Sequence, residues 1–205
     1  MLIGFNQIVN SYGVPKGIIH IGAHLMEERS SYMSNGVNKI IWIEANPSIY
    51  EKIKWANSGN EMVFNYAISD EDNLVYDLYV TNNGESSSIL EMDKHKEYHP
   101  HIWVYGSVKV NSKRMDTLIR ENSINPSSYD FLNLDIQGVE LLAMKGFGDI
   151  ISNFKYIYTE VNSAYLYSGC CLIGEIDDYL LDYGFKRVMT EMTPFEWGDA
   201  LYIRS

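Results

Sequence analysis

The sequence predicts an α/β fold built on a mostly parallel sheet, and three observations support this prediction. Short apolar segments alternate with helical stretches over most of the chain. The apolar segment 17–23 runs into a turn at Gly22, and a second apolar segment, 39–45, carries the acid Glu44 near its end. The last two apolar segments are joined by a short connection that contains Pro194, which is typical of an antiparallel hairpin.

The elements follow in order along the chain. Residues 1–16 are expected to form a helical extension, and Pro47 is expected to open the helix after the second strand, because a helix leaves its first N–H groups unpaired. Gly146 and Gly184 are read as helix stops. The expected strands cover 17–23, 39–45, 62–69, 129–135, 155–161, 185–190 and 200–204, and further helices are expected up to about residue 35 and over 116–122, 139–145 and 173–183.

The alternation breaks between the third and fourth of these strands. Segments 74–80 and 107–110 are predicted as extra strands that enclose an irregular, polar and aromatic stretch, 81–106. A long loop of this kind within a compact domain is more often a lid or binding element than a plain connection. We therefore expect residues 74–110 to form a lid or acceptor-binding insertion.

Composition limits the class of protein. A chain of 205 residues with 46% hydrophobic content is expected to form one domain over 1–205. A formal net charge of −11 argues against a nucleic-acid partner. No apolar run is long enough to cross a bilayer, and the N-terminus lacks the pattern of a signal peptide, so a cytoplasmic location is expected. Cys170 and Cys171 are neighbours, which is a poor geometry for a disulfide.

The glycine turn and the following acid are typical of a nucleoside cofactor site, in which backbone holds one end and a carboxylate binds the ribose hydroxyls. A dinucleotide site prefers G-x-G-x-x-G, but residues 22–27 contain one glycine and end in Glu27. That acid would repel a pyrophosphate, whereas S-adenosylmethionine carries a sulfonium and no phosphate. An NAD-linked oxidoreductase remains the alternative function. The simplest alternative for Gly22 and Ala23 is an ordinary strand-to-helix turn with no ligand.

Six segments together resemble the FkbM family of S-adenosylmethionine-dependent methyltransferases, in the order of that family, and the closing segment 198–204 is similar to its last strand. The segments are His20–Glu28, Trp42–Pro47, Asn65–Asp70, Ser86–Ser88, Arg114–Asp116 and Leu132–Glu140. The resemblance implies a class I methyltransferase (Rossmann-like) fold, with helices on both faces of a mostly parallel seven-stranded sheet whose last strand is antiparallel. It also implies O-methylation of a hydroxyl on a sugar, glycan or related natural product, with S-adenosylhomocysteine as the second product.

The resemblance also assigns cofactor contacts. Three groups of residues are implied: Gly22, Ala23 and His24 beneath the methionine part, Glu44 with Ala45 and Asn46 at the ribose, and Ala67, Ile68 and Ser69 beside the adenine. The sequence departs from the family at two positions. His20 stands where many members have an acid, so Glu27 or Asp135 is expected to supply that charge, and Met26 stands in a helix start that lacks the usual glycine.

Asp135, Gln137 and Glu160 follow or end neighbouring strands, so they are expected to meet at the carboxyl edge of the sheet. Methyl transfer to an alcohol requires removal of its proton, and Asp135 or Glu160 is the predicted acceptor of that proton. The structural alternative for Asp135 is a cap on the turn at Gly138. These carboxylates with Asn162 also offer oxygen ligands for a divalent metal, although no metal is expected.

The acceptor is expected to be a small molecule or a glycan that contacts the insertion. Its predicted contacts are Ser87 and Ser88, which supply hydroxyls, and Tyr98 and Trp103, which offer aromatic faces to a sugar ring. One of the insertion's histidines is an alternative base. A non-catalytic adenosyl-binding protein on the same fold is the remaining alternative function.

Overall fold

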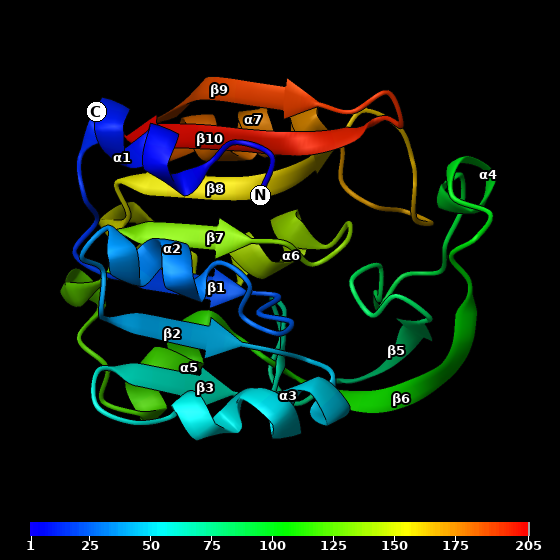
Figure 1. The fold of residues 1–205 in the computed structure, drawn as a ribbon, viewed down its shortest axis with the longest axis horizontal. Coiled ribbons are helices and arrows are strands. Elements are labelled where there is room, and N and C mark those ends of the chain that lie inside the picture. The colour runs from blue at the N-terminus through cyan, green and yellow to red at the C-terminus, as the bar shows by residue number, and fades with distance from the viewer. Residues whose placement is uncertain (205) are drawn as a thin grey trace.

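The computed structural model describes residues 1–204, at the centre of which a seven-stranded sheet has the order β3-β2-β1-β7-β8-β10-β9 (Figure 1). Its strands are β1 (Ile18–Ile21), β2 (Ile40–Ile43), β3 (Glu61–Phe64), β7 (Phe131–Leu134), β8 (Tyr156–Asn162), β9 (Phe185–Met192) and β10 (Trp197–Arg204). β10 pairs antiparallel with both neighbours, and the strands from β3 to β8 are parallel. The predicted α/β class, with its antiparallel last strand, is confirmed.

Helices cover both faces of this sheet (Figure 1). On one face lie α1 (Phe5–Tyr12), α2 (Arg29–Ser34) and α3 (Pro47–Ile53), and on the other lie α5 (Met115–Glu121), α6 (Glu140–Lys145) and α7 (Ile173–Asp182). The central strands are buried on both sides, which explains their nearly unbroken apolar sequences. Along β1, Ile18 packs toward α1 and α2, whereas Ile19 and Ile21 pack toward α5, α6 and α7.

The segment between β1 and α2 is a loop over most of its length, and the helix begins only at Arg29. Two non-glycine residues in this loop have positive φ, His24 at 40° and Met26 at 60°. Such values are uncommon for residues with a Cβ. Met26 thus adopts the conformation that the absent glycine would favour, and its buried side chain packs in the core beside α1 and α2.

The predicted third strand, 62–69, is divided into two strands that belong to different sheets. β3 ends at Phe64, and β4 (Ala67–Ile68) pairs with β6 (Val104–Lys113). β4, β6 and β5 (Val75–Thr81) form a second sheet in that order. Between β3 and β4, the Asn65 side-chain amide donates hydrogen bonds to the carbonyl oxygens of Glu44 (2.7 Å) and Ala45 (2.9 Å). These bonds hold the chain at the end of β2, where it leaves the main sheet.

The insertion forms the rest of the second sheet. β5 (Val75–Thr81) and β6 (Val104–Lys113) pair antiparallel, and β6 begins and ends three residues beyond each end of its predicted strand. The intervening loop contains one short helix, α4 (His95–Tyr98). Figure 1 shows this unit beside the carboxyl ends of the parallel strands, with α4 near the connection that follows β8. The insertion therefore stands over the edge of the sheet where the candidate residues gather.

Two smaller expectations concern membranes and cysteines. Across residues 1–204, no helix combines the length and the apolar character that a membrane crossing needs. Cys170 and Cys171 are both free thiols.

Gly146 ends α6 as predicted, but its φ of −67° is helical, so a left-handed turn is not the reason for a glycine there. A Cβ at this position would lie 2.1 Å from the carbonyl oxygen of Ser69. We expect Gly146→Ala to lower the free energy of unfolding by about 1–3 kcal/mol, because the backbone must move apart. This corresponds to roughly 2–4 °C in Tm per kcal/mol, measured by thermal unfolding.

Gly174, in the first turn of α7, is the matched control, since a Cβ there meets nothing within 4 Å. Gly174→Ala is expected to leave Tm unchanged or to raise it slightly. Equal Tm values for the two variants would contradict the role assigned to Gly146.

Candidate active site

A cleft at the carboxyl ends of the parallel strands has two compartments that share Gly22, His24, Glu85 and Asp135. We call the first the apolar compartment; its empty volume, including the part open to solvent, is about 670 Å³. Its aliphatic and aromatic walls are Ile21, Ile43, Ile49, Tyr66, Ile68, Leu78, Ile89, Ile136 and Val139. We call the second the acidic compartment, because carboxylates line much of it; its empty volume is about 1310 Å³ on the same basis.

Gly22 allows the two compartments to meet. Its φ is +88°, and a Cβ would lie 1.8 Å from the carbonyl oxygen of Asp135. Its N–H donates to the carbonyl oxygen of Ile43 at 2.9 Å. The end of β1 thus touches the backbone that follows β7, a contact that only glycine permits.

Glu44 lies at the end of β2, in the wall of the apolar compartment. Its side chain is 8% exposed, and its two oxygens each accept one backbone N–H, from His24 (2.8 Å) and from Asn46 (2.7 Å). Burial raises the pKa of Glu44, and these two hydrogen bonds oppose that rise. A carboxylate has about four acceptor sites, so Glu44 can still accept hydrogen bonds from a ligand's hydroxyls.

Asp135 follows β7, and it lines both compartments of the cleft. The Gln137 amide nitrogen bridges two acids, donating to Asp135 Oδ1 and to Glu160 Oε2, both at 2.8 Å. The Tyr167 hydroxyl donates to Gln137 Oε1 at 2.8 Å and so holds the amide in place. Loss of contact with bulk water raises the pKa of Asp135 to about 6, and the negative charge of Asp199 adds to the rise.

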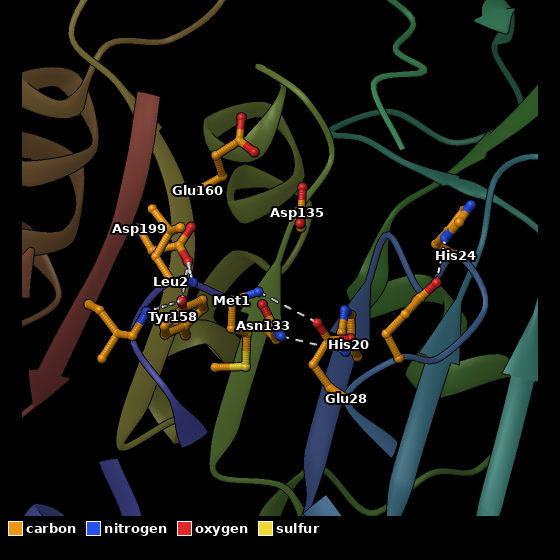
Figure 2. A network of polar contacts seen from close by, with 12 residues as sticks. Met1, Leu2, His20, His24, Glu28, Asn133, Asp135, Tyr158, Glu160 and Asp199 are labelled. Atoms are coloured by element: carbon orange, nitrogen blue, oxygen red, sulfur yellow. Dashed lines mark hydrogen bonds and ion pairs between the residues drawn. The ribbon is translucent and has the colours of Figure 1, made fainter. Parts of the chain in front are cut away.

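Glu160 and Asp199 complete a group of three acids (Figure 2). Glu160 on β8 and Asp199 on β10 are direct partners in the antiparallel pair. Asp199 accepts hydrogen bonds from the Leu2 N–H and the Tyr158 hydroxyl. Burial raises the pKa of Glu160 well above its usual range, and the neighbouring carboxylates raise it further.

The turn after β7 is capped by Glu140. This fully buried side chain accepts the N–H groups of Ile136 and Gly138 at 3.1 Å. Burial raises the pKa of Glu140 to about 7. The sequence left the capping role open for Asp135, and the geometry gives it to Glu140 instead, so the Asp135 carboxylate remains free to face the cleft.

Most of the predicted cofactor residues lie around this cleft. The residues on the apolar compartment are Gly22, His24, Glu44, Ala45, Asn46, Ala67, Ile68 and Asp135, and Glu27 and Gln137 line the acidic compartment. Two predicted residues lie elsewhere. Ala23 is buried in the core beside α1 and α2, and Ser69 is fully buried, with its hydroxyl hydrogen bonded to Asp70 and Tyr76.

The predicted acceptor residues do not line the acidic compartment. Ser87 and Ser88 line the apolar compartment, where their hydroxyls donate to the carbonyl oxygens of Gly84 (2.7 Å) and Gln137 (2.8 Å). Tyr98 packs near Phe195, and Trp103 is 57% exposed and lines a separate hollow on the insertion. The aromatic character of the insertion therefore does not identify the acceptor contacts.

The sequence prediction missed two site residues and underrated a third. Asp199 and Glu85 received no role, and His95 was one of three histidines among which no choice was made. An isolated acid between Gly198 and Ala200 in a buried strand was the available signal for Asp199. No local signal marked Glu85 or His95, since the fold of the insertion brings both to the cleft.

His20 does not supply the charge of the acid that many family members have at this position. It is buried on β1, with its ring near the Tyr32 hydroxyl (3.2 Å) and the Asn133 amide (3.5 Å). Burial lowers the pKa of His20 to about 4, so the ring is neutral at neutral pH. The candidate carboxylates for the cofactor's cationic groups are therefore those of Glu27 and Asp135, as the sequence suggested.

Three side chains that could together bind a metal ion line the acidic compartment. Within residues 1–204, His24, Glu27 and Glu85 form the single group of three whose ligand atoms all lie within 4.8 Å of one another. His24 Nδ1 and Glu27 Oε1 already form a hydrogen bond of 2.8 Å, and both glutamates are exposed. The group lies apart from the Asp135, Glu160 and Asn162 set considered from the sequence.

Residues 20–187, more than half of the chain, match the model of the methyltransferase FkbM domain. This chain belongs to the FkbM methyltransferase family. The resemblance seen in the sequence is thereby confirmed, and Gly22, Glu44 and Asp135 of this FkbM methyltransferase all fall within the matched region. No curated protein matches the chain significantly.

Solved structures agree on the fold. Magnesium protoporphyrin IX methyltransferase from Synechocystis, determined with bound S-adenosylmethionine, is 12% identical, with a TM-score of 0.53 over 98% of this chain and 76% of that one. A putative methylase from Haemophilus influenzae is 12% identical, with a TM-score of 0.50 over 99% and 94%. The 1,6-didemethyltoxoflavin-N1-methyltransferase from Burkholderia thailandensis, determined with S-adenosylhomocysteine, is 8% identical, with a TM-score of 0.51 over 97% and 75%. This FkbM methyltransferase therefore has the class I methyltransferase fold.

Proposed function

We propose that this chain is an S-adenosylmethionine-dependent O-methyltransferase that acts on a hydroxyl group of a sugar, glycan or related natural product. The observation that carries the proposal is the meeting of the apolar and acidic compartments at Gly22 and Asp135. This arrangement can hold a nucleoside on one side and a polar acceptor on the other, with a carboxylate at the junction. Cytoplasmic location and a single domain stay predictions.

The residues of the apolar compartment fit the adenosine part of the cofactor. Ile43, Ile68 and Leu78 offer apolar walls to the adenine, and Glu44 retains acceptor sites for the two ribose hydroxyls. At the junction, the absence of a Cβ on Gly22 lets the backbone approach the ligand closely. Asp135 and Glu27 supply negative charge for the methionine end.

The residues that would carry out methyl transfer are the acids Asp135 and Glu160 of the acidic compartment. S-adenosylmethionine, when bound, supplies an electrophilic methyl group on a sulfonium whose sulfur leaves as a neutral thioether. Asp135 is placed to accept the proton of the acceptor hydroxyl as its oxygen forms the new bond to carbon. Gln137 holds Asp135 and Glu160 in a fixed relation, so that Glu160 can bind the acceptor while Asp135 faces the reacting oxygen.

Thermal unfolding with S-adenosylhomocysteine tests the cofactor assignment. At a ligand concentration one hundred times Kd, the expected stabilisation is about 2.7 kcal/mol, which corresponds to roughly 5–10 °C in Tm for a chain of this size. NAD is the parallel ligand, because its pyrophosphate would meet the acids of the 22–28 loop. We expect S-adenosylhomocysteine alone to raise Tm.

Two results would contradict this expectation. A rise with NAD alone would favour an oxidoreductase, and no rise with either ligand would remove the cofactor site from the proposal. Transfer of a labelled methyl group from S-adenosylmethionine to a hydroxyl, located in the product by mass spectrometry and NMR, tests the reaction itself. A labelled cofactor that binds but is never consumed would favour the non-catalytic alternative.

A further inference from the structure

The acidic compartment carries negative charge that its own side chains do not balance. Six carboxylates line it, and no lysine or arginine does: Glu27, Glu28, Glu85, Asp135, Glu160 and Asp199. Glu27 contacts the His24 ring at 2.8 Å, and Glu28 lies 3.7 Å from the amino group of Met1. Asp135, Glu160 and Asp199 have no comparable cationic partner among residues 1–204.

These three acids form a row across neighbouring strands (Figure 2). Asp199 is the direct partner of Glu160, and the pairing of Leu134 with Thr159 places Asp135 next to Glu160 on the other side. We call Asp135, Glu160 and Asp199 the acid row. The hydrogen-bond donors to its side chains are neutral: the Gln137 amide, the Tyr158 hydroxyl and the Leu2 N–H. Like charges directly opposite each other destabilise a sheet, so the acid row lowers stability unless a cation offsets it.

Of the histidines that line the compartment, His24 contacts Glu27, and the other three do not supply a cation to the acid row. Burial lowers the pKa of both His20 and His95 to about 4, and it also lowers the pKa of His99. Both His20 and His95 are therefore neutral at neutral pH. Burial and the neighbouring carboxylates raise the pKa of Glu160, so the acid row takes up a proton more readily when no ligand is bound, and a bound cation would oppose that rise.

His95 gives a second, independent sign of a ligand. It is 6% exposed and lines the acidic compartment, and its Nδ1 has no hydrogen-bond partner among the described residues. A buried polar atom without a partner is costly, and a neutral imidazole nitrogen can accept a proton donor. The compartment thus places the carboxylates of the sheet beside a buried imidazole of the insertion whose Nδ1 lacks a partner, and a ligand with N–H or O–H groups fits this lining.

The positive charge of S-adenosylmethionine would offset only part of the negative charge in the acidic compartment. The methionine end of S-adenosylmethionine carries a sulfonium, an ammonium and a carboxylate, so its net positive charge offsets one carboxylate. Asp135 lies nearest to that end, because it shares the junction with Gly22. Glu160 and Asp199 line the acidic compartment alone and stay unbalanced.

We propose that the acceptor carries a protonated amine as well as the hydroxyl that is methylated, as an amino sugar does, and that Glu160 and Asp199 bind its ammonium group. This inference rests on the proposed function and specifies its substrate class. The acceptor oxygen forms the bond to the methyl carbon, the bond from that carbon to sulfur breaks with its electrons left on sulfur, and the hydroxyl proton passes to Asp135. The ammonium keeps all its protons.

The spacing of the acids favours an ammonium over a metal ion. Asp135, Glu160 and Asp199 do not form a group whose ligand atoms all lie within 4.8 Å of one another. An ammonium has several N–H donors that can reach separate carboxylates. Acceptors that carry phosphate or carboxylate groups would be repelled by the acid row.

The test compares ligands that differ in charge, in the presence of saturating S-adenosylhomocysteine. Glucosamine and the fully deacetylated chitosan trimer are each compared with their N-acetylated forms and with glucuronic acid, by binding and by labelled methyl transfer. We expect the amine forms to bind or react at least tenfold better than the acetylated forms, since a charge-assisted hydrogen bond contributes that much. Equal responses across the set, absence of any response included, overturn the inference, as does a requirement for Mg²⁺ in place of the amine.

Variants of Asp199 and Glu160 test whether these carboxylates cause the preference for the amine. Asp199→Asn keeps an oxygen that can accept from Tyr158 and Leu2, and it is expected to reduce the preference for the amine to about threefold or less. Glu160→Gln should act in the same way and serves if Asp199→Asn does not fold. Glu191→Gln is the matched control, because Glu191 pairs with Asp199 on β9 but is exposed and does not line the compartment.

A preference that survives both Asp199→Asn and Glu160→Gln overturns the assignment of the ammonium to these acids. Stabilisation by S-adenosylhomocysteine is read separately in every variant. If it persists while the amine preference is absent, the inference fails and the proposed function stands. If it is absent from the unmodified protein, the proposed function itself fails.

Discussion

Asp135→Asn is expected to lower kcat for methyl transfer by about 10²–10⁴-fold, because the amide cannot accept the proton of the acceptor hydroxyl. Asparagine keeps an oxygen for the hydrogen bond from Gln137, so the geometry of the cleft should persist. Binding of S-adenosylhomocysteine is expected to change much less than kcat. Asp178→Asn, an exposed change on α7, is the matched control and should leave kcat unaltered.

The pH dependence of kcat provides a second reading of the same role. The base must be ionised, and the pKa of Asp135 is raised to about 6. The rate is therefore expected to rise with pH up to a plateau above about pH 7, and to fall about tenfold per unit below the pKa. In Asp135→Asn this rise should disappear. An unchanged pH profile in that variant would assign the proton to another group.

Glu44→Gln is expected to raise the Kd for S-adenosylhomocysteine by about 10–100-fold. The carboxylate already accepts the N–H groups of His24 and Asn46 with separate oxygens, and an amide offers only one oxygen for these bonds and for the ribose. Calorimetric titration measures the change. At saturating S-adenosylmethionine, kcat should stay near that of the unmodified protein, which separates this variant from Asp135→Asn.

A surface glutamate controls for the loss of charge in Glu44→Gln. Glu191→Gln on β9 removes one charge far from the apolar compartment and should leave the Kd unchanged. Equal affinity in Glu44→Gln and Glu191→Gln would show that Glu44 does not contact the ribose.

Gly22 and Glu44 were predictable from the sequence because their signals are local. Each stands at the end of a short apolar strand, and the strand ends of a parallel sheet share one edge. The family resemblance placed Ala23 and Ser69 at the cofactor, although both lie in the protein interior. At a strand end, a shift of one residue changes whether a side chain faces the ligand site or the core. The pattern of apolar residues does not fix the strand end to within one residue.

The strand ends placed Asp135 and Glu160 at one edge of the sheet, but the sequence analysis did not place Asp199 beside them. Glu160 and Asp199 meet through the register of β8 with β10, and Asp135 joins them only through β7. His95 and Glu85 reach the cleft through the path of the insertion, whose loop has no period to indicate which side chains turn inward. The predicted acceptor residues were chosen by chemical type, and the backbone places none of them on the acidic compartment.

The two compartments share four residues, but different parts of the chain provide most of their remaining walls. Strand ends and the loops after them provide most of the apolar compartment, whereas the N-terminal residues, the loop around α4 and the connection after β8 provide much of the acidic one. On the proposed function, substitutions in the N-terminal residues or in the connection after β8, neither of which lines the apolar compartment, would alter the acceptor and leave the cofactor site unchanged. On that proposal the fold would assign the methyl donor and the acceptor to different segments of the chain, so a new acceptor specificity would not require changes in the sheet.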